Sequence, residues 1–74
     1  MVAQAADPAA TFGVELRTAR LERGMTRKEL AARSGVSYVN IRRIETTTQL
    51  PQEGTLIGLA KALDLPIATL LQWR

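Results

Sequence analysis

The chain has 74 residues and a net charge of +3, and it contains neither cysteine nor histidine. Its length allows one domain. Without cysteine and histidine it can form no disulfide, no thiolate metal site and no histidine-based catalytic site. We therefore expect that the protein is not an enzyme and binds no metal, cofactor or small-molecule ligand. The apolar runs are too short to span a bilayer and the start lacks a signal-peptide pattern, which indicates a cytoplasmic protein.

The first element expected is a helix that follows a short tail. Residues 1–7 show no apolar periodicity, so we expect a disordered tail before a domain of residues 8–74. Asp7 can cap a helix whose first position is Pro8, and Thr11 is the other candidate start.

This first helix should run to about Arg23 and end at Gly24. Gly13 lowers its helix propensity but permits close packing against a neighbour. The stripe expected to face the core consists of Phe12, Leu16, Ala19 and the edge residue Arg20.

The segment Gly24–Glu45 predicts two short helices around a tight turn. The Thr26 hydroxyl can accept a bond from the Glu29 backbone N–H while the Glu29 carboxylate reaches back, which is a capping box. Gly35 can take the left-handed conformation that ends the first of these helices, and Ser37 can cap the second.

The second of these two helices, expected over about 37–46, has two distinct faces. At about 100° per residue, Ile41 and Ile44 point the same way and form its buried anchor, while Tyr38 lies at the exposed first turn. The outer face carries Val39, Arg42, Arg43 and Thr46.

Two more helices are expected in the last third of the chain. Pro51 marks the entry to a helix over about Glu53 to Leu63, and Asp64 can tolerate the left-handed region at its end. A last short helix should run from Pro66 to about Gln72. The stripe of the longer helix holds Leu56, Leu59, Ala60 and Leu63.

The C-terminal residues offer more apolar surface than a monomer of this size needs. Leu65, Ile67 and Leu70 are expected to close the core. Leu71 and Trp73 are then left for a dimer interface, and the competing interpretation is that Trp73 folds back onto the first helix as a lid.

Positive charge gathers in the middle of the chain. Eight of the ten basic residues lie between Arg17 and Arg43, where Glu22 and Glu29 are the only acids, so this segment carries +6 and the remainder −3. The distribution favours a phosphate-binding footprint, with a merely solvated helix face as the alternative.

The middle of the chain resembles the Cro/C1-type (XRE-like) helix-turn-helix family of phage and bacterial repressors, and the similarity runs from about Phe12 to Leu71. The matching motifs are Gly24-Met25-Thr26 with Leu30-Ala31, Gly35-Val36-Ser37, and Ile41-Arg42-Arg43-Ile44-Glu45. The resemblance implies an all-α, five-helix, lambda-repressor-like domain that binds double-stranded DNA as a homodimeric transcriptional repressor.

The family resemblance places the helix over about 37–46 in the major groove. Arg43 is the best candidate base reader, because its fork can bond both acceptors of guanine. Val39 could contact a thymine methyl, and Tyr38 a methyl or a phosphate. The candidate phosphate contacts are Thr26, Arg27, Lys28, Ser37, Arg42 and Thr46.

Two further positions carry family roles. Arg20 would pair with Glu45 and thereby orient the DNA-reading helix. Arg27 stands where the family usually has a glutamine that supports this helix, so a cation there suits phosphate contact instead.

The chain departs from the family after Glu45, where an Asn-Gly stop and basic residues are usual but Thr46-Thr47-Thr48 stand here. Threonine is poor at positive φ, so the helix must end by another route, and phosphate contacts are lost. This loop and the apolar C-terminus favour the alternative function, a protein-interaction module such as an antitoxin or a coactivator bridge.

Overall fold

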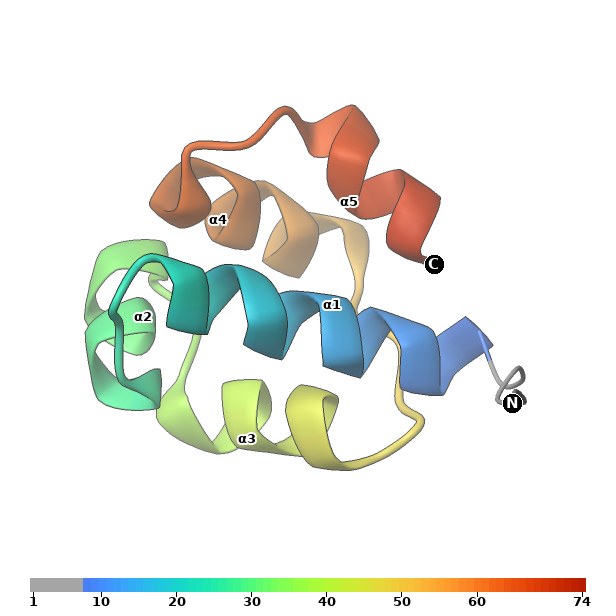
Figure 1. The fold of residues 1–74 in the computed structure, drawn as a ribbon, viewed down its shortest axis with the longest axis horizontal. Helices are drawn as coiled ribbons and strands as arrows, with labels where there is room; N and C mark the ends of the chain where they lie inside the picture. Colours follow the sequence, from blue (N-terminus) through green and yellow to red (C-terminus); the bar gives the residue numbers. More distant parts are fainter. Residues whose placement is uncertain (1–7) are drawn as a thin grey trace.

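The computed structural model describes residues 8–74. Within these residues the fold consists of five helices and no strand, as the family resemblance implied: α1 (Pro8–Glu22), α2 (Arg27–Ser34), α3 (Tyr38–Thr46), α4 (Glu53–Leu63) and α5 (Ile67–Trp73). α1 runs through the middle of the molecule, with α3 on one side and α4 and α5 on the other (Figure 1). The predicted disordered tail and the Asp7 cap lie outside the described residues.

The helices begin and end where the local sequence signals stand. Thr26 caps α2 with the complete capping box, and Gly35 ends it at φ 74°. Ser37 caps α3, because its hydroxyl accepts a bond from the Asn40 backbone N–H at 3.1 Å. Asp64 ends α4 in the left-handed region at φ 58°. These predicted boundaries are therefore confirmed.

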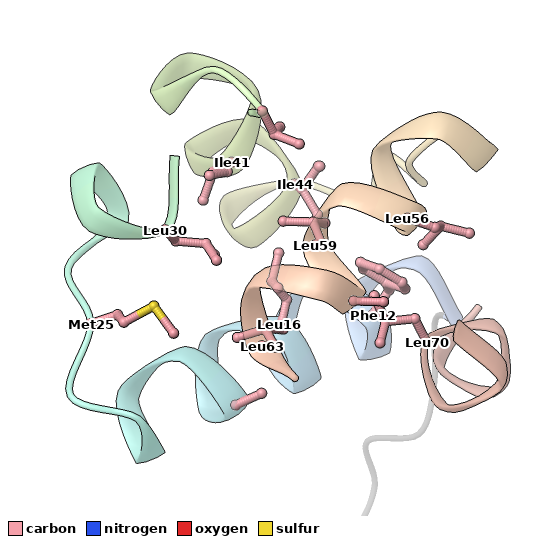
Figure 2. Close-up of a cluster of buried hydrophobic side chains, with 13 residues drawn as sticks. Phe12, Leu16, Met25, Leu30, Ile41, Ile44, Leu56, Leu59, Leu63 and Leu70 are labelled. Carbon is pink, nitrogen blue, oxygen red and sulfur yellow. The ribbon is translucent and has the colours of Figure 1, made fainter. Parts of the chain in front are cut away.

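All five helices contribute to one apolar core (Figure 2). The predicted stripes of α1, α3 and α4 are buried, and Met25 and Leu30 fill the space beneath α2. The side chains with no exposed surface are Phe12, Leu16, Leu30, Ile41, Ile44, Leu56, Leu59, Leu63 and Leu70. No helix among residues 8–74 is long and apolar enough to cross a membrane.

Gly13 sets how closely α1 approaches α3. A Cβ at this position would lie 2.6 Å from the backbone oxygen of Ile44 and 3.3 Å from that of Glu45. A real Cβ cannot come that close to a carbonyl oxygen, so only glycine allows the two helices to pack at this distance. The expected close packing at Gly13 is confirmed.

The C-terminal helix corrects two predictions. Trp73 is not surplus, because its ring packs edge-on against Phe12 of α1 with the ring centroids 5.7 Å apart, as the competing interpretation of Trp73 as a lid on the first helix expected. Ile67 does not close the core and is 37% exposed. Leu70 is fully buried and Trp73, three residues on, packs beside it against the core. Ile67 and Leu71, four residues apart, are both exposed and share the outer side of α5.

Candidate nucleic-acid interface

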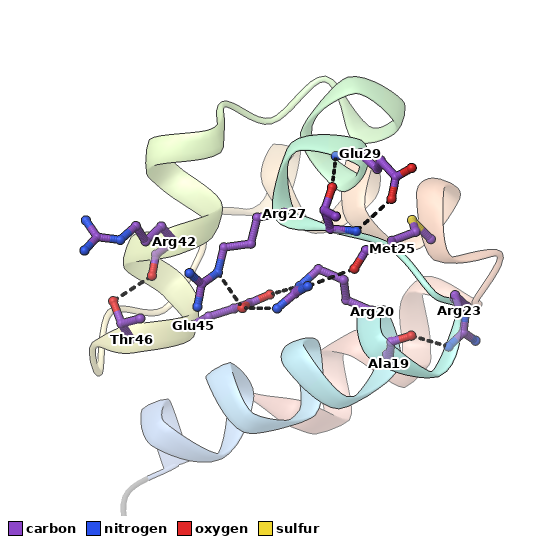
Figure 3. Close-up of polar contacts among 10 residues, drawn as sticks. Ala19, Arg20, Arg23, Met25, Arg27, Glu29, Arg42, Glu45 and Thr46 are labelled. Atoms are coloured by element: carbon purple, nitrogen blue, oxygen red, sulfur yellow. Dashed lines mark hydrogen bonds and ion pairs between the residues drawn. The ribbon is translucent and has the colours of Figure 1, made fainter.

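α3 presents an exposed outer face on the side opposite its buried isoleucines. Val39 is 60% exposed and Tyr38 is also exposed, and both Arg42 and Arg43 are exposed. Arg42 extends away from the core in Figure 3. All three predicted base readers therefore lie at the surface, where a ligand can reach them.

A buried ion pair holds α3 against α1. Arg20 Nε and a terminal nitrogen of Arg20 donate to the two carboxylate oxygens of Glu45 at 2.8 and 3.0 Å. The Glu45 side chain is fully buried and that of Arg20 is 7% exposed. The other terminal nitrogen of Arg20 donates to the Met25 carbonyl at 2.8 Å, which ties in the segment before α2. The predicted pair is present, and its geometry is bidentate (Figure 3).

Arg27 also binds Glu45, and this contact was missed in the sequence. Its Nε donates to a Glu45 oxygen at 3.0 Å, so the carboxylate joins α1, α2 and α3. The hydrogen bond to Glu45 raises the pKa of Arg27 above its ordinary value. The position that carries a supporting glutamine in the resembled family thus supports α3 here as well, through an ionic contact.

A cationic groove of about 440 Å³ lies beside this cluster. Its lining residues come from α1, the start of α2 and the first turn of α3: Arg17, Arg20, Thr26, Arg27, Lys28 and Tyr38. Three of the predicted phosphate contacts, Thr26, Arg27 and Lys28, are brought together in it. Arg17, which was counted in the basic segment but not among the candidate phosphate contacts, joins them from α1.

A second, mostly neutral hollow of about 410 Å³ lies on the other flank of α3. Arg43 and Val39 line it together with Ser37 and Asn40, and the opposite wall includes Gln49, Gln52 and Thr55. The carboxamides of Gln49 and Gln52 were not singled out in the sequence. Carboxamides can bond adenine bidentately, so their position beside Arg43 suits base contact.

The threonine loop ends α3 through side-chain hydroxyls. Thr46 Oγ1 donates to the Arg42 carbonyl at 2.7 Å, and Thr47 Oγ1 donates to the Arg43 carbonyl at 2.6 Å. Thr47 itself is extended, with φ −130°, so no left-handed residue is needed. The expected alternative ending is confirmed.

These bonds also change the set of candidate phosphate contacts. A phosphate oxygen needs a donor, and the hydroxyl proton of Thr46 is directed to Arg42, which removes Thr46 from the set in this conformation. The hydroxyls of Thr26 and Ser37 instead accept backbone N–H bonds, so their own protons remain available.

Among residues 8–74 no group of acidic side chains could hold a metal ion.

Comparison with known proteins agrees with this geometry. A helix-turn-helix domain family matches residues 11–73. The HTH-type transcriptional regulator y4dL of Sinorhizobium fredii, itself described as uncharacterized, is 45% identical over 53 residues, which cover 72% of this chain and 27% of that protein. The HTH-type transcriptional repressor RghR of Bacillus subtilis is 42% identical over 62 residues, covering 82% of this chain and 46% of that protein.

Solved structures share the fold. The restriction-modification controller protein C.AhdI from Aeromonas hydrophila aligns with a TM-score of 0.78 at 27% identity, over 84% of this chain and 94% of that one. A point mutant of C.Esp1396I bound to its highest affinity operator site aligns with a TM-score of 0.80 at 22% identity, over 92% and 90% of the two chains. The chain spans less than half the length of the two curated relatives. On its sequence match and its five-helix geometry, this chain belongs to the helix-turn-helix domain family.

Proposed function

We propose that this chain binds double-stranded DNA sequence-specifically through α3 and acts as a transcriptional repressor. The observation that carries the proposal is that α3 has an exposed outer face with Val39 and Arg43, and that buried ion pairs of Glu45 hold the helix in place. Glu45 is held by Arg20 and Arg27, so the helix that carries Arg43 is fixed relative to both α1 and α2. A fixed helix can present the same side chains to each base pair, as groove reading requires.

Each flank of α3 has a distinct role in this proposal. Arg43, Val39 and the carboxamides of the neutral hollow contact base edges, and the cationic groove binds the sugar-phosphate backbone. Arg42 and Ser37 add phosphate contacts at the rim. The regulator and repressor names of the two curated relatives, which are 45% and 42% identical to this chain over the matched residues, support a role in transcription regulation.

The binding unit in this proposal is a homodimer. Ile67 and Leu71 share the outer side of α5, and Leu71 is 48% exposed. Ile57 on α4 is exposed too, and α4 packs against α5. A two-fold dimer through this side would place two copies of α3 about one DNA turn, ~34 Å, apart.

Selection of bound sites from random duplex DNA tests the proposal. We expect a motif with two symmetric half-sites, and an affinity that falls steeply with salt because phosphate contacts release counterions. Recovery of no motif, together with binding that is equally weak for all sequences, would refute it.

The second candidate function is a protein-interaction module of the antitoxin or coactivator type. The observation that favours it is the end of α3 and the start of the following loop, where Thr46, Thr47 and Thr48 stand in place of the Asn-Gly stop and basic residues that are usual in the resembled family. Under this alternative a protein partner covers the exposed face of α3, and the binding of duplex DNA shows no sequence preference and only a shallow dependence on salt.

A further inference from the structure

Thr47 links the end of α3 to the loop that leads to α4. Its backbone N–H and its hydroxyl both donate to the Arg43 carbonyl, at 3.0 and 2.6 Å. A carbonyl oxygen has two lone pairs and can accept both bonds. The same hydroxyl oxygen accepts the backbone N–H of Gln49 at 3.2 Å. Thr47 is therefore fixed to the last turn of α3 and in turn holds the backbone of Gln49.

The neighbouring Thr46 has the same side chain but lacks this link. Its hydroxyl donates to the Arg42 carbonyl at 2.7 Å (Figure 3). Within residues 8–74 no backbone N–H donates to the Thr46 hydroxyl oxygen. The two threonines thus make the same kind of bond to α3, and only Thr47 extends it to Gln49.

Gln49 lies beside Arg43, because both side chains line the neutral hollow next to α3. Both residues are exposed, and in the described part of the chain Arg43 forms no ion pair. Gln52 lines the same hollow but is the N-cap residue of α4, and its carbonyl accepts the Leu56 backbone N–H. Of the two carboxamides, only that of Gln49 belongs to a residue whose backbone is bonded to the end of α3.

The side chains of Arg43 and Gln49 suit two different bases. A guanidinium can donate two bonds to guanine, whereas a carboxamide can both accept and donate at the edge of adenine. A long, flexible side chain discriminates between bases only when its backbone is held in place, because a mobile loop residue can adapt to any base. The hydroxyl of Thr47 supplies this restraint for Gln49.

We propose that Thr47 is a positioning residue, which holds Gln49 beside Arg43 so that Gln49 reads an adenine next to the guanine read by Arg43. This inference rests on the proposed function and goes beyond it by separating the two carboxamides of the neutral hollow. Gln49 reads the adenine, and Gln52 does not. The threonine loop thereby contributes to sequence specificity at the point where the resembled family has its Asn-Gly stop.

The test repeats the selection of sites from random duplex DNA with Gln49→Ala and Thr47→Val, and measures the affinity of each variant for the wild-type site. Gln49→Ala should lower this affinity by about 5- to 150-fold and abolish an adenine preference at one position of the motif. Valine keeps the size of threonine and favours the extended backbone found at residue 47. Thr47→Val should therefore weaken the preference at the same position and leave the guanine of Arg43 unchanged.

Three further variants are the controls. Thr47→Ser keeps the hydroxyl and should keep the wild-type motif. Thr46→Val loses a hydroxyl bond to α3 without touching the link to Gln49, so it should keep the adenine preference, as should Gln52→Ala. In a Gln49→Ala background, Thr47→Val should cause no further change in base preference, because both residues act through one carboxamide. Thermal melting confirms the fold of each variant.

The outcomes separate the inference from the proposed function. An unchanged motif in Gln49→Ala or in Thr47→Val overturns the inference while sequence-specific binding stands. An equal loss of the adenine preference in Thr46→Val also overturns it, because loosening of the end of α3 would then be the cause. A wild-type chain that selects no motif overturns both.

Discussion

At the scale of single residues, the buried carboxylate of Glu45 is the group at which two ion pairs between helices meet. It accepts bonds from Arg20 on α1 and Arg27 on α2, and its side chain has no exposed surface. Burial of ions is expensive, so such a cluster is better understood as a device for orientation than as a source of net stability. Its value for function is that it fixes α3 against two helices at once.

Removal of the Glu45 charge should therefore destabilise the fold severely. Glu45→Gln keeps the size of the side chain but leaves the buried Arg20 without a counter-charge, and we expect a loss of about 3–5 kcal/mol in the free energy of unfolding. Urea unfolding followed by circular dichroism measures it.

Glu22→Gln is the control, because the Glu22–Arg23 pair is 3.9 Å long and its carboxylate is 70% exposed; its effect should be within about 1 kcal/mol. A double-mutant cycle between Arg20 and Glu45 that gave no coupling energy would contradict the proposed role of the pair.

Arg43 carries the prediction for base reading. Arg43→Ala should weaken binding to the preferred site by about 1–3 kcal/mol and relax the preference at one base position. Repeating the site selection with the variant measures this, with Arg33→Ala as a control outside both hollows. An unchanged motif would mean that Arg43 does not read a base.

At the scale of secondary-structure elements, the packing of α1 against α3 depends on one missing methyl group. Gly13→Ala should be destabilising by about 1–3 kcal/mol, because the added Cβ meets the backbone oxygen of Ile44 at 2.6 Å and the backbone cannot move aside cheaply. This clash outweighs the gain in helix propensity, which is about 1 kcal/mol or less.

Gly54→Ala is the matched comparison within the same chain. Gly54 also lies in a helix, but a Cβ there would meet no atom within 4 Å. We expect a gain in stability of up to about 1 kcal/mol. The melting temperature should therefore fall for Gly13→Ala and rise for Gly54→Ala. A rise in both variants would show that helix propensity rather than the α1–α3 contact decides.

At the scale of the whole molecule, Leu71 and Trp73 of α5 lie on different sides of the helix. Trp73 packs against Phe12 at the edge of the chain's own core. Leu71 is exposed to solvent, where a second copy of the chain can reach it. If the proposed dimer forms through this side of α5, Leu71→Glu should convert it into a monomer without lowering the melting temperature, and sedimentation at micromolar concentration measures the change.

Trp73→Ala provides the contrast in the same experiment. It should destabilise the fold by about 1–3 kcal/mol through the lost contact with Phe12, and any effect on association should follow from that loss. A monomeric wild-type chain would refute the assignment of Leu71 to an interface.

The amino-acid sequence by itself determined the number, order and ends of the helices. These depend on residues close together in the chain: the capping box of Thr26 and Glu29, the cap at Ser37, and the left-handed ends at Gly35 and Asp64. Local hydrogen bonds and backbone preferences act over a few residues, so their signals can be read from a short window. The family motif added the long-range pair of Arg20 and Glu45, which spacing alone would not have shown.

Only the tertiary structure decided which distant side chains meet. It placed Arg27 on Glu45, Trp73 on Phe12, and Arg17 in the same groove as Lys28. Each of these contacts joins two helices, and it forms only when their crossing angle and separation are set by the packing of the whole core. The order of residues along one helix carries no record of that angle. The ends of the helices and part of each groove lining were therefore predictable, whereas the contact of Arg27 with Glu45 and the places of Gln49 and Gln52 were not.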